Sequence, residues 1–309
     1  MKRTTLYPLL VALVTLSVVG CTTSEKEIPA PTAQTATSDY SYAGYNIPEP
    51  MVEIASDYRG SNNNGQKANN LYTLGQTQVT GGHKIYCFFQ TLISSGGPNP
   101  YGPYNSGTWS EVPGPNGGGA VKIAFANNTM YVVTDQNELW QATNVTLFSN
   151  PTWTRLPVQA VDVAASGTYV YFLGTANVGG GHPIYSLSNG VATEVVPGGG
   201  AVELAVDAFG RPWLISNVRS IFVGPMPGGS GGYMQVNGLG VDIASTGSTI
   251  AVLGNTYYTH GSEVYTLDVS DPNIQNSFVP QGGEATRITG SAGGNFIVMI
   301  DNGNLYKAN

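Results

Sequence analysis

Acidic side chains recur at one position of a short repeated phrase, and they are the first candidates for chemistry in this chain. Glu53, Asp162, Glu203 and Asp242 each stand between two apolar residues. Carboxylates that lie close together can act as general acid and base. Apolar residues on both sides instead predict strands in which each acid bonds to the backbone of a neighbouring repeat. We therefore expect a structural role for these acids.

Other catalytic patterns are missing from the sequence. It contains no Ser/His/Asp set with a nucleophile elbow, no histidine pair at metal-ligand spacing and no phosphate-binding loop ahead of a helix. Cys87 lies in the strand-like run Ile85–Phe89, without a basic neighbour that would activate a thiol. We expect it to be a small buried hydrophobic residue. The sequence thus predicts no enzyme, no cofactor and no metal site.

All three histidines lie near glycines, at His83, His182 and His260, and the third closely follows Tyr257 and Tyr258. Imidazole and phenol rings can stack on sugar rings or peptide side chains, and loops carry function more often than strands do. Two interpretations stay open. These five residues form a ligand-binding face, or a hairpin was copied twice by duplication together with its histidine.

The N-terminal segment predicts secretion. Lys2 and Arg3 precede an apolar run of about 14 residues, shorter than the roughly 20 that a membrane-spanning helix needs. The following residues, Val18-Val19-Gly20-Cys21, resemble the lipobox of bacterial lipoproteins. The resemblance implies cleavage before Cys21 and lipid such as palmitate on its thiol and new amino group, which anchors a protein stably to a membrane. An ordinary signal peptide with a chance cysteine is the alternative.

We divide the chain into a signal peptide at 1–20, a flexible tether at 21–40 and a folded domain at 41–309. The tether is rich in Thr, Ser, Ala and Pro and cannot bury enough apolar surface to fold. Thr22, directly after the lipidated cysteine, resembles the sorting signal of outer-membrane lipoproteins. The expected location is the bacterial cell envelope, with lipid attached to the outer membrane.

Composition narrows the class of protein. Without Lys2 and Arg3, the basic residues fall from 12 to 10 against 19 acidic ones, which gives a formal charge of −9. An acidic surface repels phosphate backbones, so nucleic acid is excluded as a partner. Charged residues make up only 10% of the chain, and it has 41 Gly and 18 Tyr. These values indicate an all-β protein with short strands and tight turns.

The phrase that carries the acids occurs six times, beginning at Met51, Ala120, Ala160, Ala201, Gly240 and Ala285. The last five copies start 40, 41, 39 and 45 residues apart. Each copy is followed by an apolar run, an apolar-aromatic pair and a further strand-like segment. Four strands in about 40 residues is the period of a β-propeller blade. We therefore predict a six-bladed β-propeller.

The detailed pattern resembles tectonin repeats, the blades of tachylectin-like propellers. It is carried by Trp153-Thr-Arg-Leu-Pro157 with Ala160–Ala164, and by Asp207-Ala-Phe-Gly210-Arg-Pro-Trp213. The leading Trp is present in only two repeats, and the Asp-x-x-Gly turn is clear only in the fourth. The resemblance implies a propeller and a lectin-like role.

Two features refine the predicted ring. The chain ends soon after the sixth apolar-aromatic pair, so residues 41–47 are expected to pair with 304–307 and close the last blade; an open ring would leave exposed strand edges. Repeats one, three and five share a Leu-Gly pair and a long loop, so the chain reads as three copies of a two-blade unit. The long loops and the glycine-rich segments between repeats are expected to share one face.

The expected function is recognition without catalysis. We predict a lipid-anchored cell-envelope protein whose propeller loops bind glycan or envelope polysaccharide, with Cys21 joining it to the membrane. A scaffold for an envelope protein assembly is the main alternative, and a polysaccharide-acting enzyme is a less favoured one.

Overall fold

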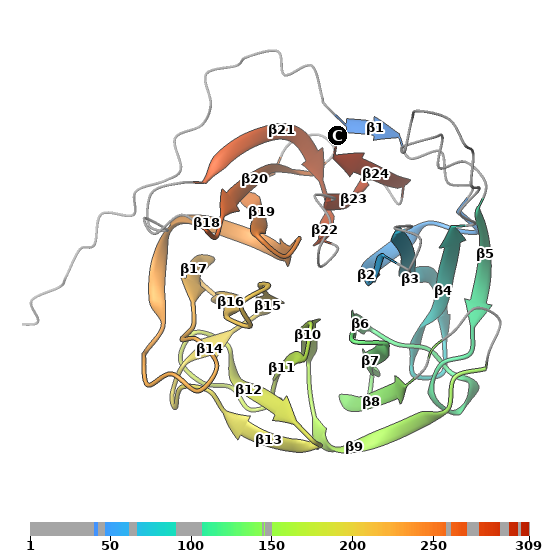
Figure 1. Cartoon of the computed structure of the whole chain (residues 1–309), viewed down its shortest axis with the longest axis horizontal. Helices are drawn as coiled ribbons and strands as arrows, with labels where there is room; N and C mark the ends of the chain where they lie inside the picture. Colours follow the sequence, from blue (N-terminus) through green and yellow to red (C-terminus); the bar gives the residue numbers. More distant parts are fainter. Residues whose placement is uncertain are drawn as a thin grey trace, which may run out of the picture.

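Apolar residues at alternate positions of each repeat produce short antiparallel strands, which pair in the order of the chain. The computed structural model describes residues 40–42, 47–61, 67–90, 107–143, 145, 150–257, 261–270, 278–290, 297–301 and 304–308. Figure 1 shows the strands as separate sheets arranged in a ring around a central axis. The all-β propeller predicted from the repeats is confirmed.

Strand pairing groups the described strands into five sheets, of four, five, seven, four and four strands, which we describe below as consecutive units of four main strands. Unit 1 holds β2 (Met51–Ser61), β3 (Lys67–Val79), β4 (Gly82–Gln90) and β5 (Gly107–Val112), and unit 2 holds β6 (Lys122–Ala126), β7 (Thr129–Val133), β8 (Glu138–Thr143) and β9 (Trp153–Gln159). Unit 3 holds β10 (Asp162–Ser166), β11 (Tyr169–Leu173), β12 (His182–Ser188) and β13 (Val191–Glu194), and the short β14 (Gly200–Ala201) pairs with β12. A 3-10 turn, η1 (Pro115–Gly117), lies between units 1 and 2.

Units 4 and 5 share one long strand. Unit 4 holds β15 (Glu203–Val206), β16 (Pro212–Ile215), β17 (Ser220–Val223) and the first part of β18 (Met234–Ser245). Unit 5 holds the rest of β18 with β19 (Thr249–Tyr257), β20 (Ser262–Asp268) and β21 (Val279–Ala285). A single strand thus ends one unit at the rim and begins the next at the axis.

Unit 6 is completed by the N-terminal side of the chain, as predicted. It holds β22 (Arg287–Gly290), β23 (Ile297–Asp301), β24 (Asn304–Ala308) and β1 (Tyr40–Tyr42). Ser41 faces Lys307 and Tyr42 faces Tyr306, both within the predicted segments, and Tyr40 extends the pairing to Ala308. Residues 43–46 of the predicted closing segment lie outside the described residues.

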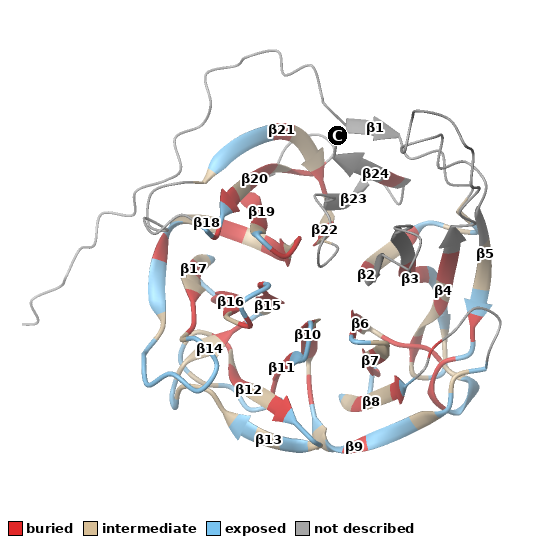
Figure 2. Cartoon of the chain, in the orientation of Figure 1, coloured by how far each residue is buried: buried red, intermediate tan, exposed pale blue. Residues whose placement is uncertain are grey.

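The apolar core lies between neighbouring units. Tyr72 of unit 1 stacks on Phe125 of unit 2, with ring centroids 4.8 Å apart, and Leu305 of unit 6 packs with Met51 and Leu71 of unit 1. Figure 2 shows buried residues concentrated in the inner strands and exposed ones along β9, β13 and β21 at the rim. Each unit therefore needs its neighbours to bury its faces, as expected for stacked repeats. Within the described residues, no helix has the length and apolarity to cross a membrane.

Candidate functional site

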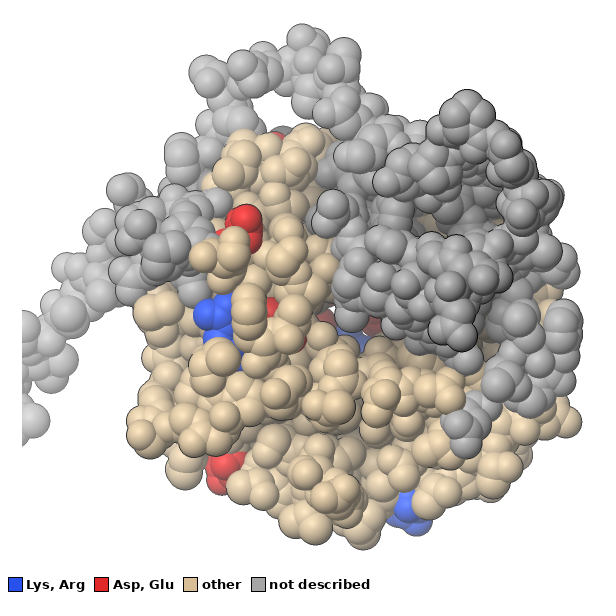
Figure 3. Space-filling view, in the orientation of Figure 1, with Lys and Arg blue, Asp and Glu red and all other residues tan. Residues whose placement is uncertain are grey.

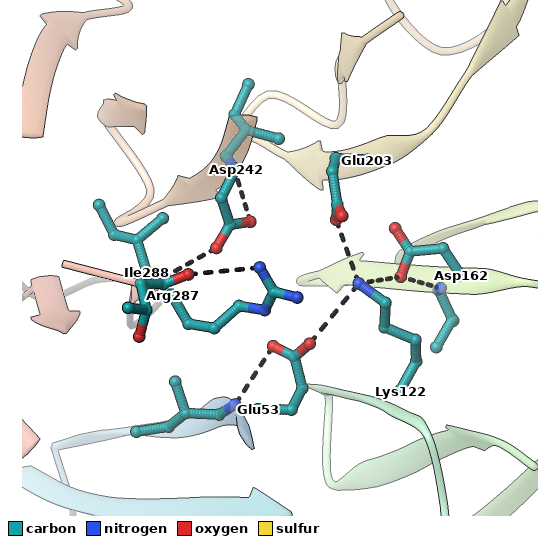
Figure 4. Close-up of polar contacts among 11 residues, drawn as sticks. Glu53, Lys122, Asp162, Glu203, Asp242, Arg287 and Ile288 are labelled. Atoms are coloured by element: carbon teal, nitrogen blue, oxygen red, sulfur yellow. Dashed lines mark hydrogen bonds and ion pairs between the residues drawn. The ribbon is translucent and has the colours of Figure 1, made fainter. Parts of the chain in front are cut away.

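The charged position of the repeated phrase forms a cluster at the axis. Each unit contributes the residue at or near the start of its inner strand, and Figure 4 shows these side chains pointing toward one another. They are Glu53, Lys122, Asp162, Glu203, Asp242 and Arg287. We call them the axial cluster. Charged atoms are also visible at the centre of the ring in Figure 3.

Lys122 holds three of the carboxylates. Its ammonium lies 3.1 Å from Glu203, 3.5 Å from Glu53 and 3.7 Å from Asp162. Asp242 instead accepts backbone N–H groups from Ile243 at 2.9 Å and, in the next unit, from Ile288 at 3.0 Å. The predicted bond to a neighbouring unit's backbone is therefore confirmed for Asp242. Glu53 and Asp162 accept the N–H of the residue that follows each of them.

The cluster holds more acid than base, and burial makes the excess costly. Burial raises the pKa of Asp162 to about 7, although Lys122 acts in the opposite direction. Burial also raises the pKa of Asp242 well above its usual range. Burial alone would lower the pKa of Lys122, but the surrounding carboxylates hold it well above its usual value. The arrangement can take up a proton, and it ties the units together across the axis.

The four acids of the phrase do not by themselves predict this cluster. Lys122 and Arg287 stand at the same position of the phrase as Glu53 and its counterparts. Aligning all six phrases gives a charged residue in every copy, which is the signal that would have predicted a ring of charge. No group of three or more His, Cys, Asp or Glu in the described part of the chain is placed to hold a metal ion.

The long loops and the junctions between units share one face, as predicted. His83 exchanges backbone hydrogen bonds with Ala120 at 2.7 and 2.9 Å, and His182 pairs with Ala201 of β14. The glycine before each contact, Gly82 or Gly181, has a positive φ of 132° or 135°, and a side chain there would collide with the alanine carbonyl. Gly261 and Ala285 repeat the arrangement in unit 5, which supports the interpretation as three two-unit copies.

His83 and His182 lie in these junctions. The Nδ1 atom of His182 is 2.9 Å from the Ala176 carbonyl oxygen of its own loop. The Nδ1 atom of His83 is buried and has no hydrogen-bond partner among the described residues. His260 and Tyr258 lie outside the described residues, and for Tyr257 only the backbone is described, at the end of β19. Whether these five residues bind a ligand stays a prediction.

Cys87 and Asp207 are buried residues that contribute to the fold. Cys87 lies in β4 with a fully buried side chain. Asp207, also fully buried, accepts N–H groups from the backbone of Phe209 and Arg211 and from the side chains of Arg211 and Trp213, at 2.7–3.0 Å. This bonding explains the Asp-x-x-Gly turn of the fourth repeat, since the buried carboxylate accepts four N–H groups of the turn, Arg211 and Trp213.

A groove lined by tyrosines lies on the opposite face. Antiparallel pairing places the first-to-second and third-to-fourth turns of a unit at the end away from the junctions. A recess of about 760 Å³ is formed there by such turns from units 2 and 3 and by Pro225–Gly229 of unit 4. We call it the tyrosine groove; it is lined by Asn127, Thr129, Tyr131, Tyr169, Tyr171, Asn189, Thr193 and Glu194, among others.

The groove presents aromatic rings beside amide and hydroxyl groups. Tyr169 is 37% exposed and packs on Gly210 of the next unit, whose carbonyl accepts the Tyr171 hydroxyl at 2.7 Å. Asn127 and Asn189 form its turns with positive φ values of 47° and 50°. The long loops and their histidines do not predict this surface. The paired turn residues Asn127-Asn128 and Asn189-Gly190 are the signal for these hairpins.

Comparisons with known proteins return structural likeness alone. No protein-family model matches the chain, and no curated protein does. YCF48 bound to D1 peptide has 10% identity over 87% of this chain and 94% of that chain, with a TM-score of 0.49. Prp20p from Saccharomyces cerevisiae has 10% identity over 87% and 88%, with a TM-score of 0.47. The Pan2 WD40 domain of Neurospora crassa has 12% identity over 81% and 72%, with a TM-score of 0.48. At these values the similarity assigns neither a partner nor an activity to this chain.

Proposed function

We propose that this protein is a non-catalytic recognition protein of the bacterial cell envelope that binds glycan or envelope polysaccharide in the tyrosine groove. Lipid on Cys21 would hold it to the outer membrane, and residues 22–39 would act as the tether. The proposal keeps the ligand class expected from the sequence and moves the site from the histidine loops to the opposite face.

The tyrosine groove is the observation that carries the proposal. A sugar ring offers C–H groups on its faces and hydroxyls around its edge, so it needs aromatic rings flanked by hydrogen-bonding groups. The exposed Tyr169 supplies the aromatic ring, and the hydrogen-bonding groups are supplied by Asn127, Asn189 and Thr193. The recess also falls within the usual size range of small-molecule sites. The resemblance to tectonin repeats agrees with a sugar-binding role.

The bonding of the buried acids supports a role without catalysis. The carboxylates of the axial cluster are engaged by Lys122 or by backbone N–H groups. Asp207 accepts four N–H groups in a turn. These contacts stabilise the ring, and the recognition surface is left to the turns at its rim.

A glycan array and retention on purified envelope polysaccharide test the proposal. Tyr169→Ala should remove the stacking surface, and Asn189→Gly should remove an amide while keeping a residue that tolerates positive φ. Both variants should lose binding. Asn137→Gly is the matched control, because Asn137 also has a positive φ of 59° but lies in a turn on the junction face. Equal retention of all three variants, or no retention of the parent protein, would refute glycan binding in the groove.

A further inference from the structure

The third strand of each unit carries an aromatic residue at one shared position. Pairing with the second strand fixes the register: Tyr86 faces Thr73, Trp140 faces Val132, Tyr185 faces Phe172, and Tyr265 faces Val252. Phe222 occupies the position in unit 4 and has no polar group. The side chain of Tyr306 in unit 6 is outside the description. Four aromatic hydrogen-bond donors can therefore be compared.

Three of these four donors are paired with a carboxylate of the chain itself. The Trp140 indole N–H donates to Glu138 at 3.2 Å, and the Tyr265 hydroxyl donates to Glu263 at 2.9 Å. In unit 1 the Glu49 carboxylate and the Tyr86 ring lie together against Gly75, and burial and this carboxylate raise the pKa of Tyr86 to about 12. The position thus brings an aromatic donor and a carboxylate together in units 1, 2 and 5.

Tyr185 in unit 3 is the exception. Val158 stands where unit 1 has Glu49, two residues before the repeated phrase, and Pro183 stands where units 2 and 5 have their glutamates. The Tyr185 ring stacks on Phe172 with centroids 5.2 Å apart, yet its hydroxyl makes no hydrogen bond to any described residue. Neither of the two positions that supply an acid in the other units holds an acid in unit 3.

A groove lies beside Tyr185, where the other units place a carboxylate. It has a volume of about 720 Å³ and is lined by Tyr185, Arg155, Val158, Gly174 and Ala176, among others. We call it the Tyr185 groove. Arg155 is 54% exposed and uses one guanidinium nitrogen to pair with Glu138 at 3.0 Å, so its other N–H groups remain for a ligand. The groove therefore combines a neutral donor with a cation.

Unit 1 shows how a carboxylate fits this setting. Glu49 accepts the backbone N–H of Thr77 at 2.8 Å, and it also accepts the Thr77 hydroxyl. Partial burial acts to raise the pKa of Glu49, but the hydrogen bonds from Thr77 and Tyr86 outweigh it, so the pKa lies below its usual value. These donors stabilise the ionised acid.

Unit 3 has most of the groups that surround Glu49 in unit 1. A side-chain carbon at Gly75 would lie 2.7 Å from the Tyr86 ring, and one at Gly174 would lie 2.8 Å from the Tyr185 ring, so the two rings sit alike. Ala176 takes the place of Thr77, and its backbone N–H makes no hydrogen bond to a described residue. The hydroxyl of Thr77 is lost, and Arg155 adds a positive charge.

We propose that the Tyr185 groove binds the carboxylate of an acidic side chain on a partner peptide. The Tyr185 hydroxyl and the Ala176 N–H donate to the carboxylate, and Arg155 pairs with it. A peptide is the occupant because the chain fills the equivalent place in unit 1 with a glutamate between two prolines, Pro48-Glu49-Pro50. The Tyr185 groove lies on the junction face, beside His182, so this site is separate from the tyrosine groove and independent of glycan binding.

Calorimetric titration with two capped peptides, Pro-Glu-Pro and Pro-Gln-Pro, tests the ligand class, and glucuronate is the third probe. The glutamate peptide should bind at least about tenfold more tightly than the glutamine peptide, because hydrogen bonds to a charged group are the stronger ones. Tyr185→Phe and Arg155→Gln should each weaken it by about tenfold. Tyr86→Phe is the matched control and should leave binding unchanged. Equal binding of the two peptides, or tighter binding of glucuronate, would overturn the proposal.

Val158→Glu tests the site by filling it. The new carboxylate should occupy the place that Glu49 takes in unit 1, so binding of the glutamate peptide should be lost. The ultraviolet titration of the tyrosines should also show one more phenol with a raised pKa, which Val158→Gln should not produce. Undiminished peptide binding by Val158→Glu, together with an unchanged tyrosine titration, would contradict the proposed placement.

Discussion

The ammonium of Lys122 lies 3.1 Å from the carboxylate of Glu203, although 81 residues separate them in the chain. Lys122 comes from unit 2, and its other carboxylate partners, Glu53 and Asp162, come from units 1 and 3. One side chain therefore links four consecutive units across the axis. The ring is held together at its centre by charge, as well as between its units by apolar packing.

Lys122→Met should destabilise the protein strongly. It would leave Glu53, Asp162 and Glu203 without their shared cation, and breaking a buried ion pair costs about 3–5 kcal/mol. Lys84→Met is the matched control, because the Lys84–Glu111 pair is partly exposed and such pairs contribute about 0–1 kcal/mol. Urea unfolding of both variants measures the difference. Similar losses in the two variants would refute the central role of Lys122.

The stability should depend on pH through Asp162. Because burial raises its pKa to about 7, the folded state binds a proton that the unfolded state has released, between about pH 4 and 7. The contribution of Asp162 to the free energy of unfolding therefore falls as the pH rises through this range.

Asp162→Asn should remove this contribution and give a flatter or rising profile from pH 5 to 8, measured by urea unfolding. Asp135→Asn, in an exposed turn, should keep the profile of the parent protein. If Asp162→Asn follows the same profile as the parent, Asp162 does not carry the raised pKa.

Deletion of residues 40–42 should open the ring. It would leave the outer edge of β24 unpaired, because Ser41 and Tyr42 pair with Lys307 and Tyr306. Deletion of 24–38, predicted as tether, should be nearly neutral. Thermal unfolding compares the two. Equal melting temperatures would contradict closure by β1.

Cys21→Ala should abolish lipid attachment and leave the precursor uncut at the lipobox. Incorporation of labelled fatty acid into the protein in growing cells, followed by gel electrophoresis, measures this directly. Tyr7→Ala, in the apolar run before the cut, should still be labelled. Labelled lipid on the Cys21→Ala protein would disprove the lipoprotein interpretation.

The repeats were sufficient to predict the ring because each copy of the phrase reports one inner strand. A short apolar run such as Tyr169–Leu173 predicts a buried strand without knowledge of the rest of the chain. The exact closing register was not predictable in the same way, since residues 40–42 and 306–308 are far apart in sequence. Their pairing is set by three-dimensional packing.

The sites were harder to predict than the ring. The tyrosine groove combines turns that start at Asn127, Gly167 and Asn189 with Pro225–Gly229, and no single repeat contains all of them. In the Tyr185 groove, Val158 stands where unit 1 has the acid Glu49. The absence of an acid there points to a site only when the structure shows that Glu49 lies beside Tyr86. Histidines in glycine loops gave a stronger signal in the sequence, yet His83 and His182 lie in backbone junctions between units.

Chemical-shift mapping of the isotope-labelled protein with oligosaccharides from the envelope polysaccharide tests glycan recognition most directly. The account predicts perturbed amides at 127–131, 167–171, 186–195 and 225–229, and loss of these changes in Tyr169→Ala. Perturbations confined to the junction face around His83 and His182, or none at millimolar oligosaccharide, would contradict it.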